Sequence, residues 1–401
     1  MPPGRGRKKI EFERADRLKK LPPYLFVEID RKKRLAQKRG MDLVDLGIGD
    51  PDLPTPARIV EKLRREALRL ENHRYPSARK LEEFSAAAAR WFGRRYGVKV
   101  NPATQVLPVI GTKEGLGHFP LAFVNPGDVV LIPDPAYPVY HSATVLAGGV
   151  SKRLPLREED GFLPDLDRVD KRTRARARIL FLNYPNNPTA AVADRAFYRS
   201  AVEFALENRI ILVNDAAYAE IAYDGFKCPS LLQERGAFEV AVEFHSLSKT
   251  YNMCGWRVGF AVGNADLIAG LAKLKSNIDS DVFGAVLGAA TTALRTGGPH
   301  LKKTLRIYEE RRDILVGGLR EMGWDVRSPE ATFYIWLRVP GGQGSVRFAS
   351  DLIRSAGVVT APGVGFGEMG EGYIRMSLTC GTGKIRQAVR RLKKAGSRLK
   401  S

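Results

Sequence analysis

One lysine, Lys249, stands out for the chemistry that it could do. It lies in the stretch HSLSKTYNMCGWRVGF, residues 245–260, between two short hydroxyl residues and upstream of an arginine and several glycines. Such a lysine is either a solvated charge after a strand or an amine that condenses with an aldehyde. Polar residues elsewhere in the chain decide between these interpretations. If the lysine reacts with the aldehyde of a cofactor, other residues must bind the rest of that cofactor.

Several other polar residues come directly after apolar segments. The segment RIILVNDAAY carries Asp215 at its end and Tyr218 three residues later. Burying a carboxylate is costly without a positive partner, although an aspartate can also cap the next helix. Asn187 in NYPNNPTA has a similar position, which turn formation explains equally well. The segment GTKEG, residues 111–115, is predicted to open a helix, and the first amide groups of a helix suit a phosphate.

Together these residues fit one cofactor, pyridoxal 5′-phosphate. This cofactor needs a lysine amine for its aldehyde, an anion facing its ring nitrogen, donors to its ring oxygen and a cradle for its phosphate. Lys249 can supply the amine and Asp215 the anion, while Asn187 and Tyr218 can supply the hydrogen bonds. An arginine offers a fixed fork of donors that suits phosphate. The predicted cradle consists of Thr112, Lys113, Ser246, Ser248 and Arg257.

Alternating strands and helices are predicted to position these residues. The apolar segments 105–111, 128–135, 177–188 and 209–218 are separated by helical patterns such as 195–208. This alternation predicts parallel βαβ units with helices on both faces of one sheet. In such sheets ligands bind beyond the carboxyl ends of the strands, where most of the candidate residues fall.

The last part of the chain shows a different pattern. Residues 300–323 predict a long amphipathic helix, and residues 331–340 and 372–380 predict antiparallel strands around a helix at 345–357. We therefore expect a smaller α+β domain after about residue 290.

Composition limits the class of protein. At 401 residues the chain predicts two domains, and its hydrophobic content of 44% and charged content of 27% are typical of a soluble globular protein. No apolar run approaches the roughly 20 residues that span a bilayer, and no signal sequence follows the basic start, so we expect a cytoplasmic protein.

The three cysteines and five histidines show no metal-ligand or triad spacing. His245 and Ser246 could suggest a hydrolase pair, but adjacent strand residues point to opposite faces.

The net charge of +21 is concentrated at the two ends of the chain. Residues 1–40 hold 14 basic and 5 acidic residues, and residues 381–401 hold 8 basic and no acidic ones. A nucleic-acid-binding protein would carry such a basic footprint. However, Ile385, Val389 and Leu392 have helical spacing, so the C-terminal run predicts an amphipathic helix with a solvated basic face. We therefore do not expect a nucleic-acid partner.

The order of four motifs identifies a family. YPNNPT, NDAAY, SLSKTYNMCGWRVG and GYIRMSLT occur in the order that is typical of the class I/II pyridoxal-phosphate aminotransferases, and the resemblance runs from about residue 20 to the end. Within that family, RYPS, GTKEGLGHFP, KSNIDS and ATFYIW most resemble the LL-diaminopimelate aminotransferases and their relatives.

This resemblance implies an α/β chain with the fold type I of pyridoxal-phosphate-dependent transferases. A large cofactor-binding domain with a mostly parallel sheet would span residues 46–290, and a smaller α+β domain would span residues 291–401. Residues 1–45 would form an N-terminal arm and the first part of the small domain. The resemblance also implies a homodimer with active sites at the subunit interface.

The resemblance further assigns a role to each site residue. Lys249 would bond to the cofactor and then move the substrate α-proton, Asp215 would pair with the pyridinium, and Asn187 and Tyr218 would hold the ring oxygen. Asn187 would also border the substrate. The other assigned residues are Tyr24 over the substrate side chain, Gly49 where backbone approaches the substrate, Tyr75 at the phosphate of the neighbouring subunit, Tyr137 stacked on the ring and Arg375 clamping the α-carboxylate.

The chain departs from the pattern of its relatives at several positions. Lys80, Ala190 and Asp281 stand where relatives commonly have glycine. Plant-like diaminopimelate enzymes carry an acidic residue just after the tyrosine that corresponds to Tyr75, placed to meet the distal ammonium of the substrate. This chain has SARK there, and Arg79 and Lys80 would instead favour a distal carboxylate if they face the pocket.

We therefore expect a ping-pong aminotransferase that moves an amino group from an amino acid to a 2-oxo acid, with 2-oxoglutarate as the expected acceptor. The donor is LL-diaminopimelate, for lysine biosynthesis, or else aspartate, alanine or an aromatic amino acid. A pyridoxal-phosphate C–S β-lyase is an alternative, since the cofactor motifs are shared. A polyanion-binding protein that uses its basic ends is the non-enzymatic alternative.

Overall fold

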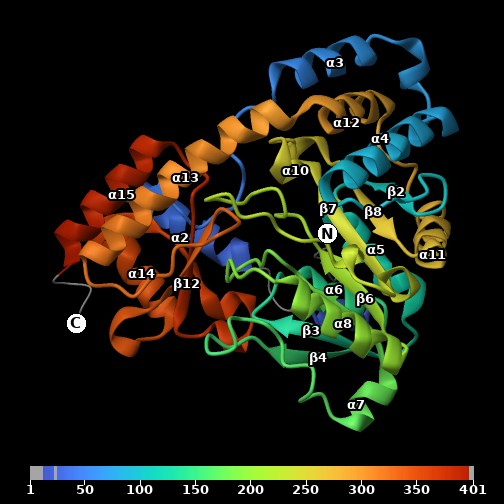
Figure 1. Ribbon diagram of the computed structural model, residues 1–401. Helices are drawn as coiled ribbons and strands as arrows, with labels where there is room; N and C mark the ends of the chain where they lie inside the picture. The colour runs from blue at the N-terminus through green and yellow to red at the C-terminus, as the bar shows by residue number, and fades with distance from the viewer. Residues whose placement is uncertain (1–11, 22–24, 397–401) are drawn as a thin grey trace, which may run out of the picture.

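A seven-stranded sheet forms the centre of the larger part of the molecule (Figure 1). The computed structural model describes residues 12–21 and 25–396, without the side chains of residues 25–29, so Tyr24 lies outside the described residues. The strands, in their spatial order, are β2 (Val106–Val109), β8 (Gly259–Gly263), β7 (Ala241–Ser246), β6 (Ile211–Asp215), β5 (Ala177–Leu182), β3 (Val129–Asp134) and β4 (Val150–Pro155).

Most of this sheet is parallel, as the sequence predicts. Strands β7, β6, β5, β3 and β4 pair in parallel, whereas β8 runs antiparallel to both of its neighbours, β7 and β2. The alternation of apolar segments and helices did not reveal the reversed strand β8. Strand β4, which the sequence analysis did not predict, forms the edge and is half exposed.

Helices cover both faces of the sheet, and this explains why strands such as β3 and β5 are almost entirely apolar. In β5, Leu180 and Leu182 pack into one core, and Ile179 and Phe181 pack into another, because alternate side chains point to opposite faces. The first core is shared with α4 (Ala78–Tyr96), α8 (Arg195–Asn208) and α12 (Gly284–Thr296). The second core is shared with α5 (Thr112–Phe123), α6 (Val139–Leu146) and α11 (Ala265–Lys275).

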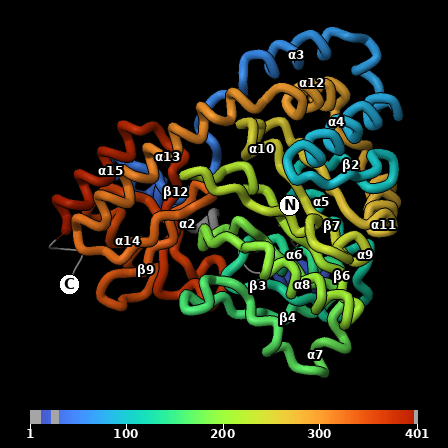
Figure 2. The backbone as a smooth tube through the Cα atoms, viewed as in Figure 1, coloured from blue at the N-terminus to red at the C-terminus, as the bar shows by residue number. Residues whose placement is uncertain are grey.

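A smaller α+β region contains the C-terminal part of the chain. Its sheet has the order β11 (Ala361–Pro362), β12 (Tyr373–Ser377) and β9 (Tyr334–Arg338), and it is antiparallel, as predicted. Three helices pack with it, α13 (Gly298–Glu321), α14 (Ser345–Ala356) and α15 (Thr382–Ala395). The tube view shows α12 and α13 following one another from the large sheet to this region (Figure 2).

The N-terminal part of the chain joins this smaller region. Strand β1 (Val44–Asp45) pairs in parallel with β10 (Val358–Val359). Lys32 on α2 (Leu25–Lys38) donates to Oγ of Ser350 on α14 over 3.2 Å, so these two helices are neighbours (Figure 2). The domain boundaries at residues 45/46 and 290/291 stay a prediction. The remaining elements are α1 (Asp16–Lys19), α3 (Ala57–Ala67), η1 (Leu70–His73), α7 (Lys171–Arg176), η2 (Leu231–Gln233), α9 (Ala237–Val240), α10 (Leu247–Thr250), η3 (Cys254–Trp256), η4 (Pro340–Gly342), η5 (Gly363–Phe366) and η6 (Glu368–Gly370).

The three helices predicted for the tail are confirmed, and α14 matches the predicted 345–357 almost residue for residue. Helix α13 covers almost all of the predicted 300–323, and in α15 the side chains of Ile385, Val389 and Leu392 are buried against the core. Among the described residues, no helix combines the length and the apolar content that crossing a bilayer requires.

Two neighbouring glycines in α13 offer a test of how closely α13 and α15 pack. A Cβ at Gly318 would lie 2.4 Å from Cγ1 of Val389, whereas a Cβ at Gly317 would meet no atom within 4 Å. We expect Gly317→Ala to stabilise the protein by up to about 1 kcal/mol through helix propensity. Gly318→Ala should destabilise it by about 1–3 kcal/mol through overpacking. Urea unfolding measures both, and equal effects of the two variants would contradict the close packing.

Candidate active site

A cavity of about 340 Å³ opens beyond the carboxyl ends of β5, β6 and β7. Its lining includes twelve of the fourteen residues that the sequence analysis selected, drawn from both the large sheet and the smaller region. These twelve are Gly49, Thr112, Lys113, Tyr137, Asn187, Asp215, Tyr218, Ser246, Ser248, Lys249, Arg257 and Arg375. Of the other two, Tyr24 lies outside the described residues, and Tyr75 is 81% exposed and does not line this cavity.

Asp215 ends the central strand β6, and its carboxylate is buried. The hydroxyl of Tyr140 donates to Oδ2 over 2.9 Å, and the backbone N–H of Ala217 donates to Oδ1 over 3.2 Å. Burial raises the pKa of Asp215 to about 6, although both hydrogen bonds lower it. A carboxylate in this position favours a cationic partner, and a protonated ring nitrogen would be such a partner.

Tyr140 is a site residue that the sequence analysis missed. It is 1% exposed, and its ring stacks on Phe181 with centroids 5.0 Å apart and planes at 19°. The spacing of Tyr137 and Tyr140 in AYPVY is helical, so both tyrosines could have been assigned to one helix face. No signal in the sequence indicated that the second one contacts Asp215.

A chain of amide groups links Asp215 to Arg375. Asn183, also missed from the sequence, donates from Nδ2 to the backbone oxygen of Asp215 over 2.7 Å and accepts from the backbone N–H of Asn187 over 2.9 Å. The Asn187 side-chain oxygen accepts from Nη1 of Arg375 over 2.7 Å. Because that oxygen faces Arg375, the NH2 group of Asn187 is the part that can donate to a ring oxygen.

Arg375 on β12 is held in a fixed orientation. Only 1% of it is exposed, and its Nη2 donates to the backbone oxygen of Gly47 over 2.9 Å. Its guanidinium lies 4.1 Å from the ring centroid of Tyr334 and 4.7 Å from that of Phe366. A planar, fixed guanidinium at the edge of a cavity suits a carboxylate.

Two tyrosines meet at the wall between the regions. The hydroxyl groups of Tyr218 and Tyr334 are 3.0 Å apart, and burial raises the pKa of the Tyr218 phenol, so it stays a hydrogen-bond donor. A Cβ at Gly49 would lie 2.0 Å from the Tyr334 hydroxyl. A side chain at this position would therefore collide with Tyr334, and the role of Gly49 toward the substrate stays a prediction. Tyr334 itself was not predicted as a site residue.

Lys249 lies on the single turn α10 that directly follows β7. Its Nζ is 3.4 Å from the backbone oxygen of Gly49 and 3.4 Å from Sγ of Cys254. The ammonium also lies 5.7 Å from the ring centroid of Phe333. The amine therefore projects into the cavity rather than into bulk solvent.

The start of α5 and Arg257 form an anion-binding corner. Gly111 is the N-cap of α5 with φ +76°, and a Cβ there would lie 2.4 Å from Nη2 of Arg257. Arg257 donates from Nη1 to the backbone oxygen of Cys254 over 2.6 Å and to Oγ of Ser248 over 3.5 Å. A helix start, an arginine and hydroxyl groups together suit a phosphate.

His245 lies on the other face of β7 from the cavity, as predicted. Its Nε2 is 2.7 Å from Oε1 of Glu243, and its ring stacks on Phe260 at 18°. Ser246 lines the cavity, so the two residues form no hydrolase pair.

Two of the departures from the pattern of relatives coincide with an unusual backbone. Ala190 has φ 61° and Asp281 has φ 65°, a region that favours glycine. The third, Lys80, is in helix α4 and has no such requirement.

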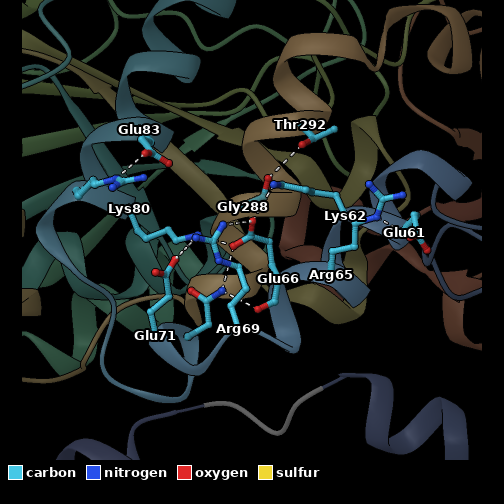
Figure 3. Close-up of polar contacts among 12 residues, drawn as sticks. Glu61, Lys62, Arg65, Glu66, Arg69, Glu71, Lys80, Glu83, Gly288 and Thr292 are labelled. Atoms are coloured by element: carbon cyan, nitrogen blue, oxygen red, sulfur yellow. Dashed lines mark hydrogen bonds and ion pairs between the residues drawn. The ribbon is translucent and has the colours of Figure 1, made fainter.

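Arg79 and Lys80 do not line the cavity. Lys80 is 11% exposed and forms an ion pair with the carboxylate of Glu66, as Figure 3 shows. Arg79 is exposed and pairs with Glu83, with 3.0 Å between Nε and Oε1. These two cations were expected to favour a distal carboxylate only if they faced the pocket, and they do not face the cavity of their own chain.

Comparisons with known proteins agree with this geometry. The sequence profile of the family described as "Aminotransferase class I and II" matches residues 41–392. The chain is 52% identical to the LL-diaminopimelate aminotransferase of Syntrophobacter fumaroxidans, over 96% of this chain and 99% of that protein. It is 50% identical to the enzyme of the same name from Aquifex aeolicus, over 95% and 99%.

Solved structures show the same fold. Substrate-bound BacF from Bacillus subtilis superposes with a TM-score of 0.91 at 37% identity, over 96% of this chain and 98% of that one. The aspartate aminotransferase of Thermus thermophilus with maleate superposes with a TM-score of 0.88 at 29% identity, over 96% and 100%. The fold type I architecture is thereby confirmed.

The raised pKa of Asp215 predicts a pH-dependent stability of the cofactor-free protein. Below about pH 4 the carboxyl group is protonated in both the folded and the unfolded states, and its burial causes no charge-related loss. Between about pH 4 and pH 6 the unfolded chain ionises this group while the folded protein keeps it protonated, so the folded state loses up to about 3 kcal/mol of stability, and above pH 6 the loss stays constant. We expect Asp215→Asn to abolish this loss.

Urea unfolding of the cofactor-free proteins at several pH values measures the effect. The stability gained by Asp215→Asn should grow between pH 4 and pH 6 and stay constant above. Asp167→Asn, at an exposed aspartate, is the matched control. A gain that does not depend on pH would contradict the buried anion.

Proposed function

Because the chain belongs to the class I and II aminotransferases, we propose that its cofactor is pyridoxal 5′-phosphate and that its amino donor is LL-diaminopimelate. The cavity supports the cofactor assignment, because Lys249, Asp215, Arg375 and the anion-binding corner all line it. Relatives that are 48–52% identical along nearly the whole chain and are named LL-diaminopimelate aminotransferase support the donor. The expected acceptor is 2-oxoglutarate.

The cavity residues fit the cofactor group by group. Asp215 would pair with the ring nitrogen, Asn187 and Tyr218 would donate to the ring oxygen, and Tyr137 would cover the ring. When bound, the cofactor supplies an aldehyde for amine exchange and a ring that accepts electrons from the substrate α-carbon. The phosphate would lie among Thr112, Lys113, Ser246, Ser248 and Arg257.

The chain itself would orient the substrate and move its proton. Arg375, held by Asn187 and the backbone of Gly47, would bind the α-carboxylate in a bidentate manner. Binding at this fixed point would direct the α-carbon toward the amine of Lys249, which would remove the α-proton and return it. Asp215, an anion above about pH 6, would keep the opposite side of the site negative.

The positions of Arg79 and Lys80 remove one objection to LL-diaminopimelate as the donor. A distal ammonium would be repelled by uncompensated cations, and SARK suggested such cations at Arg79 and Lys80. Both side chains are paired with carboxylates, Arg79 with Glu83 and Lys80 with Glu66. These ion pairs hold both cations outside the cavity of their own chain.

A homodimer would complete the site. The exposed side chains Leu68, Leu70, Tyr75 and Phe283 lie in or beside α3, η1 and α12, which contact one another. Apolar side chains concentrated on one exposed face are typical of subunit interfaces. Tyr75 would reach the phosphate in the neighbouring subunit. A cytoplasmic location stays a prediction.

Addition of single donors to the purified, cofactor-loaded protein tests the proposed donor. LL-diaminopimelate, aspartate, glutamate, alanine and phenylalanine are added one at a time while the visible absorption of the cofactor is followed. We expect a fast change with LL-diaminopimelate and reversal by 2-oxoglutarate. A fast change with aspartate alone would overturn the donor but keep the transaminase. Release of pyruvate and ammonia from cystathionine without amino transfer would favour a β-lyase.

Replacing Lys249 tests the catalytic assignment. We expect Lys249→Ala to lower turnover by at least about 10²–10⁴-fold, the contribution that a positioned acid–base group makes. Steady-state rates with the best donor measure this. Lys273→Ala on α11, at an exposed position, is the control and should leave the rate unchanged. Normal turnover of Lys249→Ala would contradict the assignment.

A further inference from the structure

A second concentration of buried charge lies outside the cavity, around Glu66 on α3 (Figure 3). We call Glu66, Lys62, Arg69, Asn72 and Lys80 the Glu66 cluster. The Glu66 side chain is 3% exposed; its Oε1 lies 2.7 Å from Nζ of Lys62 and 3.5 Å from Nη1 of Arg69. Its Oε2 accepts from Lys80 and, over 3.0 Å, from Nδ2 of Asn72.

The charge of this carboxylate is satisfied by the chain itself. Burial raises the pKa of Glu66, but the hydrogen bonds from Lys62, Lys80 and Asn72 outweigh it and lower the pKa to about 2. Glu66 is therefore an anion at neutral pH. Its two lysine partners come from different helices, α3 and α4.

The Glu66 cluster closes one segment of the chain at both ends. Glu66 precedes residues 67–77, and Lys80 follows them on the first turn of α4. Asn72, in the middle of the segment, is 3% exposed and also donates to the backbone oxygen of Glu66 over 2.7 Å. The segment is thus fixed at its start, its middle and its end.

Helix α12 packs against the Glu66 cluster at two glycines, Gly284 and Gly288. A Cβ at Gly288 would lie 2.9 Å from Cγ of Glu66, and a Cβ at Gly284 would lie 2.5 Å from Oδ1 of Asn72. The α12 backbone therefore packs directly on the cluster, and the cluster cannot shift without moving this helix.

The fixed segment nevertheless exposes large side chains. Leu68, Leu70 and Tyr75 are 75%, 76% and 81% exposed. A buried charged network generally adds less stability than apolar packing of the same volume would, and its best-supported use is to specify one geometry. A rigid base under an exposed aromatic side chain is such a geometry.

We propose that the Glu66 cluster is a positioning device for Tyr75, which holds residues 67–77 in the conformation in which the Tyr75 hydroxyl contacts the phosphate in a second copy of the chain. This inference rests on the proposed function, in which Tyr75 crosses the subunit interface. Glu66 and Lys80 are then positioning residues that affect cofactor retention without touching the cofactor. It also gives Lys80 a role at a position where glycine is usual among relatives.

The test measures the rate of cofactor release from the holoenzyme of three single variants. We expect Tyr75→Phe and Glu66→Gln each to accelerate release by about tenfold to a hundredfold, the range for a lost hydrogen bond to a charged group. Glu61→Gln is the matched control, because Glu61 lies on the same helix and pairs with Arg64 and Arg65 at the surface. It should release the cofactor at the wild-type rate.

The double variant Glu66→Gln with Tyr75→Phe separates positioning from general stability. If Glu66 acts through Tyr75, the double variant releases the cofactor no faster than Tyr75→Phe alone. Multiplying effects would overturn the inference, and so would a wild-type release rate in Glu66→Gln. If Glu66→Gln does not fold, Glu66→Gln with Lys80→Gln removes one buried charge of each sign and takes its place.

The experiments also distinguish a failure of the premise, that Tyr75 reaches the phosphate of a second copy, from a failure of the proposed function. A wild-type release rate in Tyr75→Phe would show that Tyr75 does not reach the phosphate, and it would overturn the inference while amino transfer persists. A wild-type protein that neither binds the cofactor nor transfers amino groups would instead overturn the proposed function.

Discussion

The carboxylate of Asp215 lies at the end of a central strand and away from bulk water, and much of the cavity is arranged around it. Strand β6 is buried between β5 and β7, so its last residue lies deep in the molecule. Tyr140 and the backbone of Ala217 hold the carboxylate, and Asn183 holds the backbone oxygen of the same residue. These contacts fix the anion but do not neutralise it, and its pKa of about 6 reflects that imbalance.

The sheet brings the other groups to the same edge because parallel strands end together. Lys249 follows β7 by one turn, and the start of α5 lies next to Arg257 because Gly111 has no Cβ. The smaller region adds Arg375 from β12 and Tyr334 from β9. The cavity thus depends on both regions, and the proposed anchors for the substrate carboxylate and for the cofactor come from different regions.

Sequence patterns predicted Lys249, Asp215 and Asn187 because each of them follows an apolar strand. Gly49, Tyr137 and Arg375 were assigned only through the resemblance to the aminotransferases. The same patterns could not predict Tyr140, Asn183 or Tyr334, since their roles depend on contacts between distant segments. The reversal of β8 was missed for a similar reason, because strand direction depends on the pairing of distant segments. Nor could the sequence reveal where Arg79 and Lys80 point, since side-chain pairing with Glu83 and Glu66 decides it.

Two of the buried carboxylates, Asp215 and Glu66, show how burial can serve opposite purposes. Around Glu66 the chain supplies cations from α3 and α4, and the pKa falls to about 2. Around Asp215 it supplies neutral donors, and the pKa rises to about 6. A charge that the chain compensates by itself favours a fixed local geometry. A charge that is held but left uncompensated favours the binding of a cation, which is the role proposed for Asp215.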